Sequence, residues 1–313
     1  MIRFDKLKII TNIKYISNIN DKAFATQTIN GNLQYYKYSI KKPYCLCIIA
    51  NYQLHELSIE FTGKILKDEY VNLINQTNIR QCFEEINKLG ICTLSINDIL
   101  QDSEVSKCDI TKDVDYDDLN NIIDYIKQHL VNYRKWIIKE KHNGIVLENS
   151  ADTPRHRKRL TIYNKEQELK LVGNKDFLNL LSNRKVLLNY FKSKIRFEFN
   201  INTKTQIRTF LKISTNSLND VLTSTTNPLA TIINETIKET ETTPYIKNVQ
   251  NYLRYLLLKE CSFNLAEVEA KIRALSSTNT VISRRIRPYK QLLNNLNDPT
   301  FSLSKLQELV SLV

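Results

Sequence analysis

The sequence predicts an α+β protein in which a largely antiparallel sheet carries helices on one face and an α-helical region follows. Up to about residue 213, short runs with a period of two alternate with longer runs of helical spacing, and beyond that point the pattern is helical to the end. Asn143-Gly144 lies between two of the short runs and is a strong signal for a β-hairpin turn. We therefore expect a sheet unit over residues 1–213 and a helical unit over residues 214–313.

The expected strands share an alternation of apolar and polar residues. They span residues 43–51, 57–61, 92–96, 107–114, 159–164 and 194–202, together with a hairpin over 135–148. The expected helices have apolar residues three and four positions apart. They span residues 67–90, 117–128, 175–191, 203–213, 246–260, 265–274, 282–296 and 302–312, with a polar linker near 214–245.

The chain is basic, and most of its excess positive charge lies in one stretch. The formal net charge is +12 and the sequence pI is about 9.3. Residues 134–196 hold 16 Lys and Arg against 6 Asp and Glu, an excess of ten, whereas the preceding residues 109–124 are acidic. A basic zone beside a carboxylate cluster suits an enzyme that holds a phosphate backbone and coordinates a metal, so we expect nucleic acid as the partner.

The sequence shows neither a membrane segment nor a disulfide pattern. No apolar run approaches the roughly 20 residues of a membrane span, and the first residues lack the apolar core of a signal peptide. None of the six cysteines belongs to a C-x-x-C pair, so buried free thiols are the simplest interpretation. These features predict a cytoplasmic protein without a membrane partner.

Four expected strands place a carboxylate or a tyrosine opposite their apolar residues. These are Glu60, Asp109, Glu198 and Tyr163, and strand side chains alternate between two faces, so all four point away from the core. If the strands share one sheet, the three carboxylates suit Mg²⁺ or Mn²⁺, and the tyrosine is a nucleophile for a phosphodiester. The solvent face of any antiparallel sheet carries polar residues at the same period, so a merely solvated surface also fits this pattern.

The residue sequences of these four strands carry further information. The segments are L-S-I-E-F at residues 57–61, K-C-D-I-T-K-D at 107–113, L-T-I-Y-N-K-E-Q-E at 160–168 and I-R-F-E-F at 195–199. In this order they resemble the R-I-E-F, R-L-D-L-A-x-D, R-I-Y-N-K-x-Q-E and W-R-x-E-x-E-L strands of the Rep_trans family, the rolling-circle replication initiators of small staphylococcal plasmids. The resemblance covers residues 55–213, and the filamentous-phage nicking initiators look similar at the Y-x-K and R-x-E segments.

The resemblance implies a replication initiator that nicks one strand of origin DNA, stays attached through a 5′-phosphotyrosine and recruits a host helicase in a bacterial cytoplasm. By motif, Tyr163 would be the nucleophile and Glu60, Asp109 and Glu198 the ligands of Mg²⁺ or Mn²⁺, with Asp113 a weaker candidate. Arg196 would pair with a phosphate or orient Glu198. Dimers are common among the plasmid relatives, although nothing in this sequence marks an interface.

The sequence departs from these relatives at the expected metal site. Asn200 stands where the Rep_trans strand has a second acidic residue, and the His-hydrophobic-His motif of other nicking enzymes is missing. His55 and His156 lie near the motif segments and are alternative metal ligands, although lone histidines are more often incidental.

Two basic segments are expected to hold DNA. The first surrounds the tyrosine and comprises Arg155, Arg157, Lys158, Arg159 and Lys165, with Arg196 on the next strand. The second follows from reading residues 265–274 and 280–293 as a helix-turn-helix whose second helix carries Arg284, Arg285 and Arg287. A solvated basic helix fits the second segment nearly as well, since Pro288 interrupts the recognition helix.

Two other functions stay open from the sequence. A metal-dependent endonuclease would use the carboxylates with water, form no covalent adduct and tolerate Tyr163→Phe. A non-catalytic origin-binding or repressor protein would bind DNA through the helical region and tolerate the loss of Glu60, Asp109 and Glu198.

Overall fold

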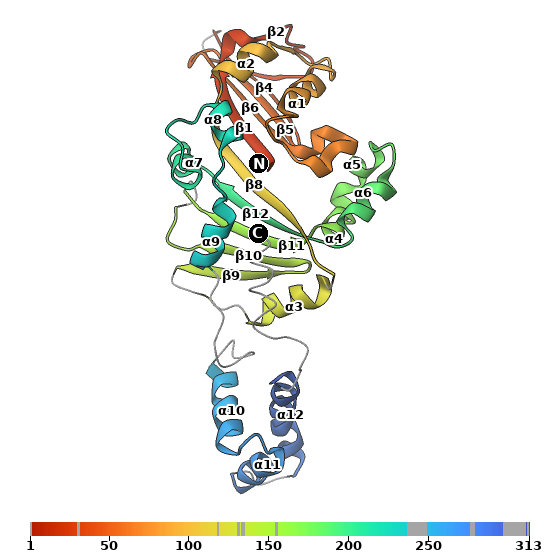
Figure 1. Cartoon of the computed structure of the whole chain (residues 1–313), viewed down its shortest axis with the longest axis vertical. Coiled ribbons are helices and arrows are strands. Elements are labelled where there is room, and N and C mark those ends of the chain that lie inside the picture. Colours follow the sequence, from red (N-terminus) through yellow and green to blue (C-terminus); the bar gives the residue numbers. More distant parts are fainter. Residues whose placement is uncertain are drawn as a thin grey trace.

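The computed structural model describes residues 2–29, 32–117, 119–129, 132, 135–153, 156–236, 249–275, 279–296, 311 and 313. Within these residues the protein is α+β, with a large antiparallel sheet, helices packed on it and further helices towards the C-terminus (Figure 1). The predicted fold class is therefore confirmed.

The main sheet contains ten strands among the described residues, and every neighbouring pair is antiparallel. Their order is β3-β4-β5-β6-β1-β8-β12-β11-β10-β9. The strands are β1 (Phe4–Asn12), β3 (Ala25–Ile29), β4 (Asn32–Ile40), β5 (Leu46–Asn51), β6 (Glu56–Thr62), β8 (Glu104–Asp115), β9 (Trp136–Lys141), β10 (Gly144–Asn149), β11 (Arg159–Asn164) and β12 (Lys194–Ile201). A separate pair joins β2 (Ile16–Ser17) to β7 (Thr93–Leu94).

One face of the sheet is covered by helices and forms the main core. The helices are α1 (Ile79–Asn87), α2 (Ile96–Asp102), α3 (Leu119–His129), α7 (Lys204–Leu211), α8 (Leu218–Thr223) and α9 (Pro228–Thr236), with a short 3-10 turn η1 (Ile13–Tyr15) beside them. Their buried residues join alternate strand residues, such as Leu57, Ile59 and Phe61, in one cluster. Alternation along each strand thus leaves the polar residues on the opposite face.

A second group of helices gathers at one end of β8, β11 and β12 (Figure 1). It comprises η2 (Gly63–Asn72), α4 (Lys165–Leu169), η3 (Val172–Asn174), α5 (Lys175–Asn179) and α6 (Arg184–Phe191). These segments have their own apolar cluster, which includes Tyr70, Leu169, Phe177 and Phe191. This cluster forms a wall beside the polar face of the central strands.

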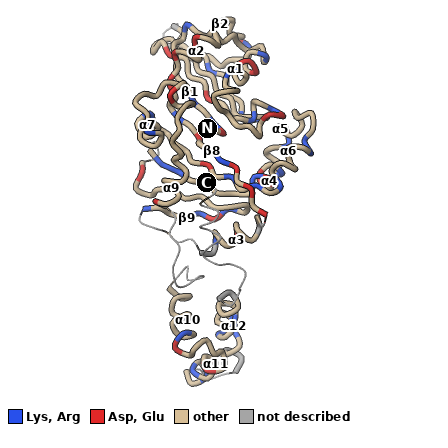
Figure 2. The backbone as a smooth tube through the Cα atoms, viewed as in Figure 1, with Lys and Arg blue, Asp and Glu red and all other residues tan. Residues whose placement is uncertain are grey.

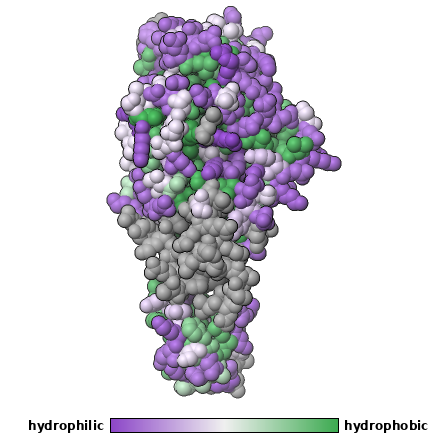
Figure 3. Space-filling view, in the orientation of Figure 1, coloured by the Kyte–Doolittle hydropathy of each residue, from purple (hydrophilic) through white to green (hydrophobic). Residues whose placement is uncertain are grey.

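Three further helices pack against one another apart from the sheet (Figure 1). They are α10 (Val249–Glu260), α11 (Leu265–Ala274) and α12 (Asn279–Leu296), and α12 continues through Pro288. Leu258, Val268 and Ile286 lie in their shared core. Figure 3 shows apolar and hydrophilic residues side by side on the surface of this end of the molecule, as on the sheet unit.

Several boundaries differ from those that the sequence predicts. Helices α8 and α9, expected in the linker, bury Leu218 and Ile232 in the core of the sheet, so the sheet unit extends to residue 236 rather than 213. The expected helix over 67–90 is η2 followed by α1, and that over 175–191 is α5 followed by α6. The expected helix over 302–312 lies almost wholly outside the described residues.

Candidate active site on the polar face of the sheet

The polar face of the central strands carries the four residues that the alternation singles out. Directly opposed residues in an antiparallel sheet point to the same face. The register places Glu60 on β6 and Asp109 on β8 on the same face, through their shared neighbour β1. Glu198 on β12 and Tyr163 on β11 lie on that face as well. The four side chains therefore share one surface, as expected if their strands belong to one sheet.

Tyr163 lies at the end of β11 with its hydroxyl held between opposite charges. The hydroxyl donates to Glu198 Oε2 at 3.0 Å and accepts from Lys165 Nζ at 3.4 Å. The residue is only 8% exposed. Burial, and then the negative charge of Glu198, raise the pKa of Tyr163 well above that of a free tyrosine. The phenol is thus protonated at neutral pH and needs a base before it can act as a nucleophile.

The turn after Tyr163 brings Lys165 back beside the hydroxyl. Asn164 accepts a hydrogen bond from the backbone of Gln167 at 3.0 Å and so caps α4, which begins at Lys165. Lys165 is 2% exposed and forms an ion pair with Glu168 at 2.7 Å. The Y-N-K-E-Q-E segment therefore has a structural explanation. Its strand positions Tyr163, and the capped helix that follows places the ammonium of Lys165, paired with Glu168, beside the tyrosine hydroxyl.

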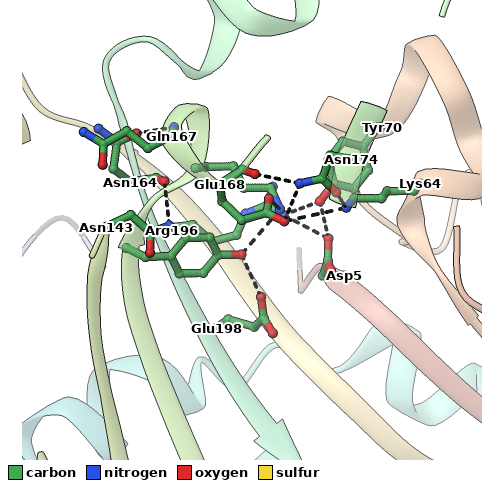
Figure 4. Close-up of polar contacts among 12 residues, drawn as sticks. Asp5, Lys64, Tyr70, Asn143, Asn164, Gln167, Glu168, Asn174, Arg196 and Glu198 are labelled. Carbon is green, nitrogen blue, oxygen red and sulfur yellow. Dashed lines mark hydrogen bonds and ion pairs between the residues drawn. The ribbon is translucent and has the colours of Figure 1, made fainter. Parts of the chain in front are cut away.

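Lys64 extends this charge cluster from η2. Its ammonium lies 3.7 Å from Glu168 Oε1 and donates to Asn174 Oδ1 at 2.6 Å, and Figure 4 shows the three side chains converging. Burial alone would raise the pKa of Glu168, but the ammonium groups of Lys165 and Lys64 lower it to about 2. Glu168 is therefore ionised throughout the neutral range and neutralises cations instead of taking part in proton transfer.

Arg196 holds the same end of the face together from a fully buried position. Its Nε and Nη2 donate to the two oxygens of Asp113 at 2.7 and 2.8 Å. Its Nη1 donates to Asp5 at 2.9 Å and to the Tyr70 hydroxyl at 2.7 Å, and that hydroxyl donates to Asp5 at 2.6 Å (Figure 4). Bidentate pairing of this kind fixes geometry as well as charge. The guanidinium is thus turned to protein groups rather than to a phosphate in solution.

Asp5 belongs to the site, although no pattern in the sequence selected it. In the pairing of β1 with β8, Phe4 opposes Ile110 and Lys6 opposes Asp109, so Asp5 is the extra residue of a β-bulge. A bulge re-aims a side chain and breaks the two-residue period. Phe4 is fully buried in the main core, and both Asp5 and Lys6 make contacts on the polar face. The interrupted alternation concealed both the strand and its carboxylate.

Two carboxyls of the face titrate well above their usual range. Burial raises the pKa of Asp109 to about 6, with a further contribution from Asp5, although the amide of Asn200 and the ammonium of Lys6 oppose the shift. Burial, and then the charges of Asp5 and Asp109, raise the pKa of Glu198 to about 8. Both carboxyls are therefore held mainly by burial, with nearby carboxylates as the second contribution, in a state that keeps a proton to a higher pH than a free carboxyl does.

The chemistry of these donors fits a divalent cation only in part. The described residues contain no group of three or more His, Cys, Asp or Glu side chains arranged to hold a metal. Glu60 is paired with Lys6, and Asp109 accepts a hydrogen bond from Asn200, which stands at the position of the missing acidic residue. The expected three-carboxylate set is thus not assembled. Asp109 and Glu198 remain suitable, because hard cations prefer carboxylate oxygens.

We expect Mn²⁺ to raise the melting temperature more at pH 8 than at pH 6. Because both carboxyls have raised folded pKa values, the folded protein binds protons that the unfolded chain has lost between about pH 4 and pH 8, and its stability falls as pH rises through that window. A cation between the ionised groups replaces those protons, so its stabilising effect grows over the same window. Differential scanning fluorimetry with and without Mn²⁺ measures this.

Glu198→Gln should remove most of the Mn²⁺-dependent shift, whereas Glu60→Gln should leave it as in the wild type, because Glu60 is neutralised by Lys6. A shift that is independent of pH, or equal in the two variants, contradicts a cation held by Asp109 and Glu198.

The basic residues expected around the tyrosine separate into two groups. Arg157, Lys158 and Arg159 lie at the start of β11, where Lys158 is 3.7 Å from Asp152 and the exposed Arg159 is 3.9 Å from Glu148. Lys165 and Arg196 are instead buried and paired, and Arg155 lies outside the described residues. Among the described residues of this set, the first group alone is open to solvent.

The remaining expected residues lie away from the tyrosine cluster. Arg284, Arg285 and Arg287 are exposed on α12, as a DNA-contacting helix requires. His55 is an exposed turn residue with a positive φ, and the ring of the exposed His156 contacts the Thr153 hydroxyl at 2.9 Å. Within the described residues, neither histidine forms a hydrogen bond or an ion pair with Glu60, Asp109 or Glu198.

Further lysines on the polar face were not selected from the sequence. Lys8 on β1 opposes Lys107 on β8, and Lys141 on β9 faces the same side as Tyr163 two strands away. Figure 2 shows basic and acidic positions interspersed around β8 and α4. These lysines are isolated in the sequence and come together only through strand pairing. Like charges directly opposite each other destabilise a sheet, so the pair formed by Lys8 and Lys107 suits an anionic partner.

Comparison of the chain with protein-family models, curated proteins and solved structures found no match. In the part of the chain that the structure describes, no helix is both long enough and apolar enough to cross a lipid bilayer.

Proposed function

We propose that this protein is a replication initiator that nicks one strand of origin DNA with Tyr163 and so starts rolling-circle replication of a plasmid or phage. The observation that carries the proposal is the Tyr163 hydroxyl, held between the carboxylate of Glu198 and the ammonium of Lys165 on a polar sheet face. A buried tyrosine that is merely structural needs one hydrogen-bond partner, not a base on one side and a cation on the other. The resemblance of four strand motifs to the Rep_trans initiators supports the same reading.

The proposed reaction is an in-line transesterification. The Tyr163 oxygen attacks the phosphorus of a phosphodiester and the bond between phosphorus and the 3′ oxygen breaks. The 3′ oxygen leaves as a hydroxyl that takes its proton from water, and the DNA 5′ end remains on the tyrosine as a phosphate ester. Glu198 accepts the phenolic proton in its ionised form, which is populated as pH rises towards its raised pKa of about 8, and its Oε2 already accepts the hydrogen bond of that hydroxyl. Lys165 stabilises the negative charge that forms on the oxygen. The phosphotyrosine ester conserves bond energy, so the strand can later be rejoined.

The proposal includes Mg²⁺ or Mn²⁺ as cofactor. Asp109 and Glu198 would hold it, Glu198 through the oxygen that Tyr163 does not use. When bound, such an ion supplies a Lewis acid that neutralises charge on the phosphodiester. Origin DNA is the proposed partner, contacted by Arg157, Lys158 and Arg159 at the sheet and by Arg284, Arg285 and Arg287 on α12, with a host helicase and a second copy of the chain as further proposed partners.

The test is a gel assay for covalent attachment. Protein and Mn²⁺ are mixed with end-labelled single-stranded DNA of randomised sequence, and the recovered adducts are sequenced to identify the nick site. Wild type should give a shifted, protease-sensitive band and Tyr163→Phe none, because the nucleophilic oxygen is gone. Tyr35→Phe is the matched control, since Tyr35 lies on the same face of β4 and should keep full activity.

The other outcomes identify the rival functions. Cleavage without a shifted band, unchanged in Tyr163→Phe, indicates a metal-dependent endonuclease that uses water. DNA binding with neither cleavage nor attachment indicates an origin-binding or repressor protein, and then the carboxylate face is structural.

A further inference from the structure

A pocket of about 210 Å³ opens on the polar face beside the Tyr163 hydroxyl. Its lining comprises Lys141, Asn143, Gly144, Ile145, Thr161, Tyr163, Glu168 and Glu198, and the carboxylate of Glu168 is already paired with Lys165 at 2.7 Å. The proposed nucleophile and its base thus form one wall, and the end of the β9–β10 hairpin forms the other. The proposed function assigns no role to that opposite wall.

The pairing of three strands explains why the pocket exists. Lys141 on β9 opposes Gly144 on β10, and Gly144 opposes Tyr163 on β11. Neighbouring strands lie about 4.8 Å apart, so the backbones of Lys141 and Tyr163 are separated by roughly 10 Å. Because Gly144 has no Cβ, β11 approaches β10 closely there, and no side chain of β10 stands between Lys141 and Tyr163. The ammonium of Lys141 and the phenol of Tyr163 therefore lie in one row across the sheet, with Gly144 between them.

The ammonium of Lys141 differs from that of its neighbour on the same face. Lys139, two residues earlier on β9, forms an ion pair with Glu148 at 2.5 Å. Lys141 is exposed and forms no ion pair with the residues that the structure describes. An uncompensated cation that lines a pocket with a nucleophile favours an anion in that pocket.

We infer that this pocket binds the scissile phosphodiester and that Lys141 contacts its non-bridging oxygen from the side opposite Glu198. Thr161, on the strand of the nucleophile, supplies a hydroxyl donor to the same group. Lys141 thereby holds the phosphorus beside the Tyr163 oxygen and stabilises the charge of the transition state. The inference rests on the proposed function for the identity of the phosphate, but the pocket and its cation stand without it.

The first measurement is the rate of adduct formation under single-turnover conditions, with the oligonucleotide recovered from the randomised pool. Lys141→Met should slow the reaction by about 10- to 100-fold, less than the roughly 100- to 1,000-fold cost of losing a buried transition-state donor, because Lys141 is exposed. Lys139→Met is the matched control and should stay within about 3-fold, because the ammonium that it removes is already paired with a carboxylate. Lys141→Arg should recover most of the rate, because it keeps the charge. Equal rates for Lys141→Met and Lys139→Met overturn the inference.

The second measurement does not depend on activity. The affinity for a fluorescent oligothymidylate is followed against salt concentration, in the wild type and the same variants. Loss of one phosphate contact lowers the logarithmic salt slope by about 0.7 for a single strand. If the wild type forms no adduct, the nickase proposal fails, and this slope alone decides the pocket. A lower slope only in Lys141→Met supports a phosphate site, whereas an unchanged slope overturns it.

Discussion

Replacing Arg196 with methionine should destabilise the protein by about 3–5 kcal/mol, because removing one partner of a buried ion pair leaves uncompensated charge behind. Arg196 is fully buried and supplies hydrogen bonds to Asp113, Asp5 and Tyr70. Methionine fills part of the volume but leaves both carboxylates without their donor. Denaturant unfolding of wild type and variant at neutral pH gives a midpoint and a slope for each, and from these the difference in the free energy of unfolding.

Arg159→Met provides the matched control on the adjacent strand. Arg159 is exposed and lies 3.9 Å from Glu148, so its loss should cost less than about 1 kcal/mol. Arg196→Lys should fall between the two variants, since lysine keeps the charge but not the planar fork that meets both oxygens of Asp113. Equal losses for Arg196→Met and Arg159→Met contradict a structural role for the buried pair.

The cost of Arg196→Met should depend on pH in a defined direction. Burial opposes ionisation of Asp5, but the charges of Arg196 and Lys165 hold its pKa below the usual value. A carboxyl with a depressed folded pKa contributes stability that is present above its unfolded pKa, about 3.9, and is lost as pH falls through the folded value. The difference between wild type and variant should therefore shrink in acid, where a protonated Asp5 no longer needs the guanidinium.

Strands with an uninterrupted alternation were predicted best. The strand at residues 159–164 was predicted residue for residue. The hairpin expected over 135–148 is present to within one residue at each end, although its turn is His142-Asn143 and Gly144 already begins β10. By contrast, β1, β3 and β4 were not predicted. In β1 the bulge at Asp5 shifts the apolar positions from a two-residue to a three-residue spacing. For that reason the sequence pattern did not predict β1, the central strand of the site, or the roles of Asp5 and Lys6 on it.

Helix boundaries failed for a different reason. The single helix expected over residues 67–90 ends early at Leu73, which follows η2 with a φ of 53°, and η2 itself is kinked at Lys67, also with a φ of 53°. Such values favour glycine, and no glycine stands at either position to mark the break. The side chains of Asn75 and Asn78 hold the Leu73 carbonyl through hydrogen bonds of 3.2 and 2.6 Å. These bonds come from polar side chains two and five residues further along the chain, which the apolar spacing alone does not report.

The candidate site was predicted in outline rather than in its contacts. Tyr163 and Glu198 were selected and do meet, at 3.0 Å. Glu60 was selected on the same pattern, but Lys6 from the unpredicted strand neutralises it. Alternation along a strand predicts the face on which a carboxylate lies, but it does not predict which cation on a neighbouring strand pairs with that carboxylate. The partners of each carboxylate therefore required the strand order, with β1 between β6 and β8.

Gly144→Ala should lower the rate of covalent attachment by about 100-fold, the order of effect that a misplacement of the reacting groups by about 1 Å produces. A Cβ at this position would lie 2.1 Å from the Ile162 carbonyl oxygen and 2.6 Å from the Tyr163 Cα. Both neighbours are backbone atoms of β11, which cannot rotate away as a flexible side chain does. The strands must separate locally, and Tyr163 moves relative to Glu198 on β12, to which it donates its hydrogen bond.

Gly173→Ala is the control, because a Cβ there would meet nothing within 4 Å. The Gly144→Ala variant should also lose about 1–3 kcal/mol of stability, the usual cost of forcing atoms into a packed site, so unfolding and attachment are measured on the same samples. If Gly144→Ala is destabilised but attaches DNA at the wild-type rate, the distance between Tyr163 and Glu198 does not control the chemistry. If both properties fall and Gly173→Ala keeps both, close approach of β10 to β11 positions the nucleophile, and glycine at the hairpin turn is required for activity as well as for folding.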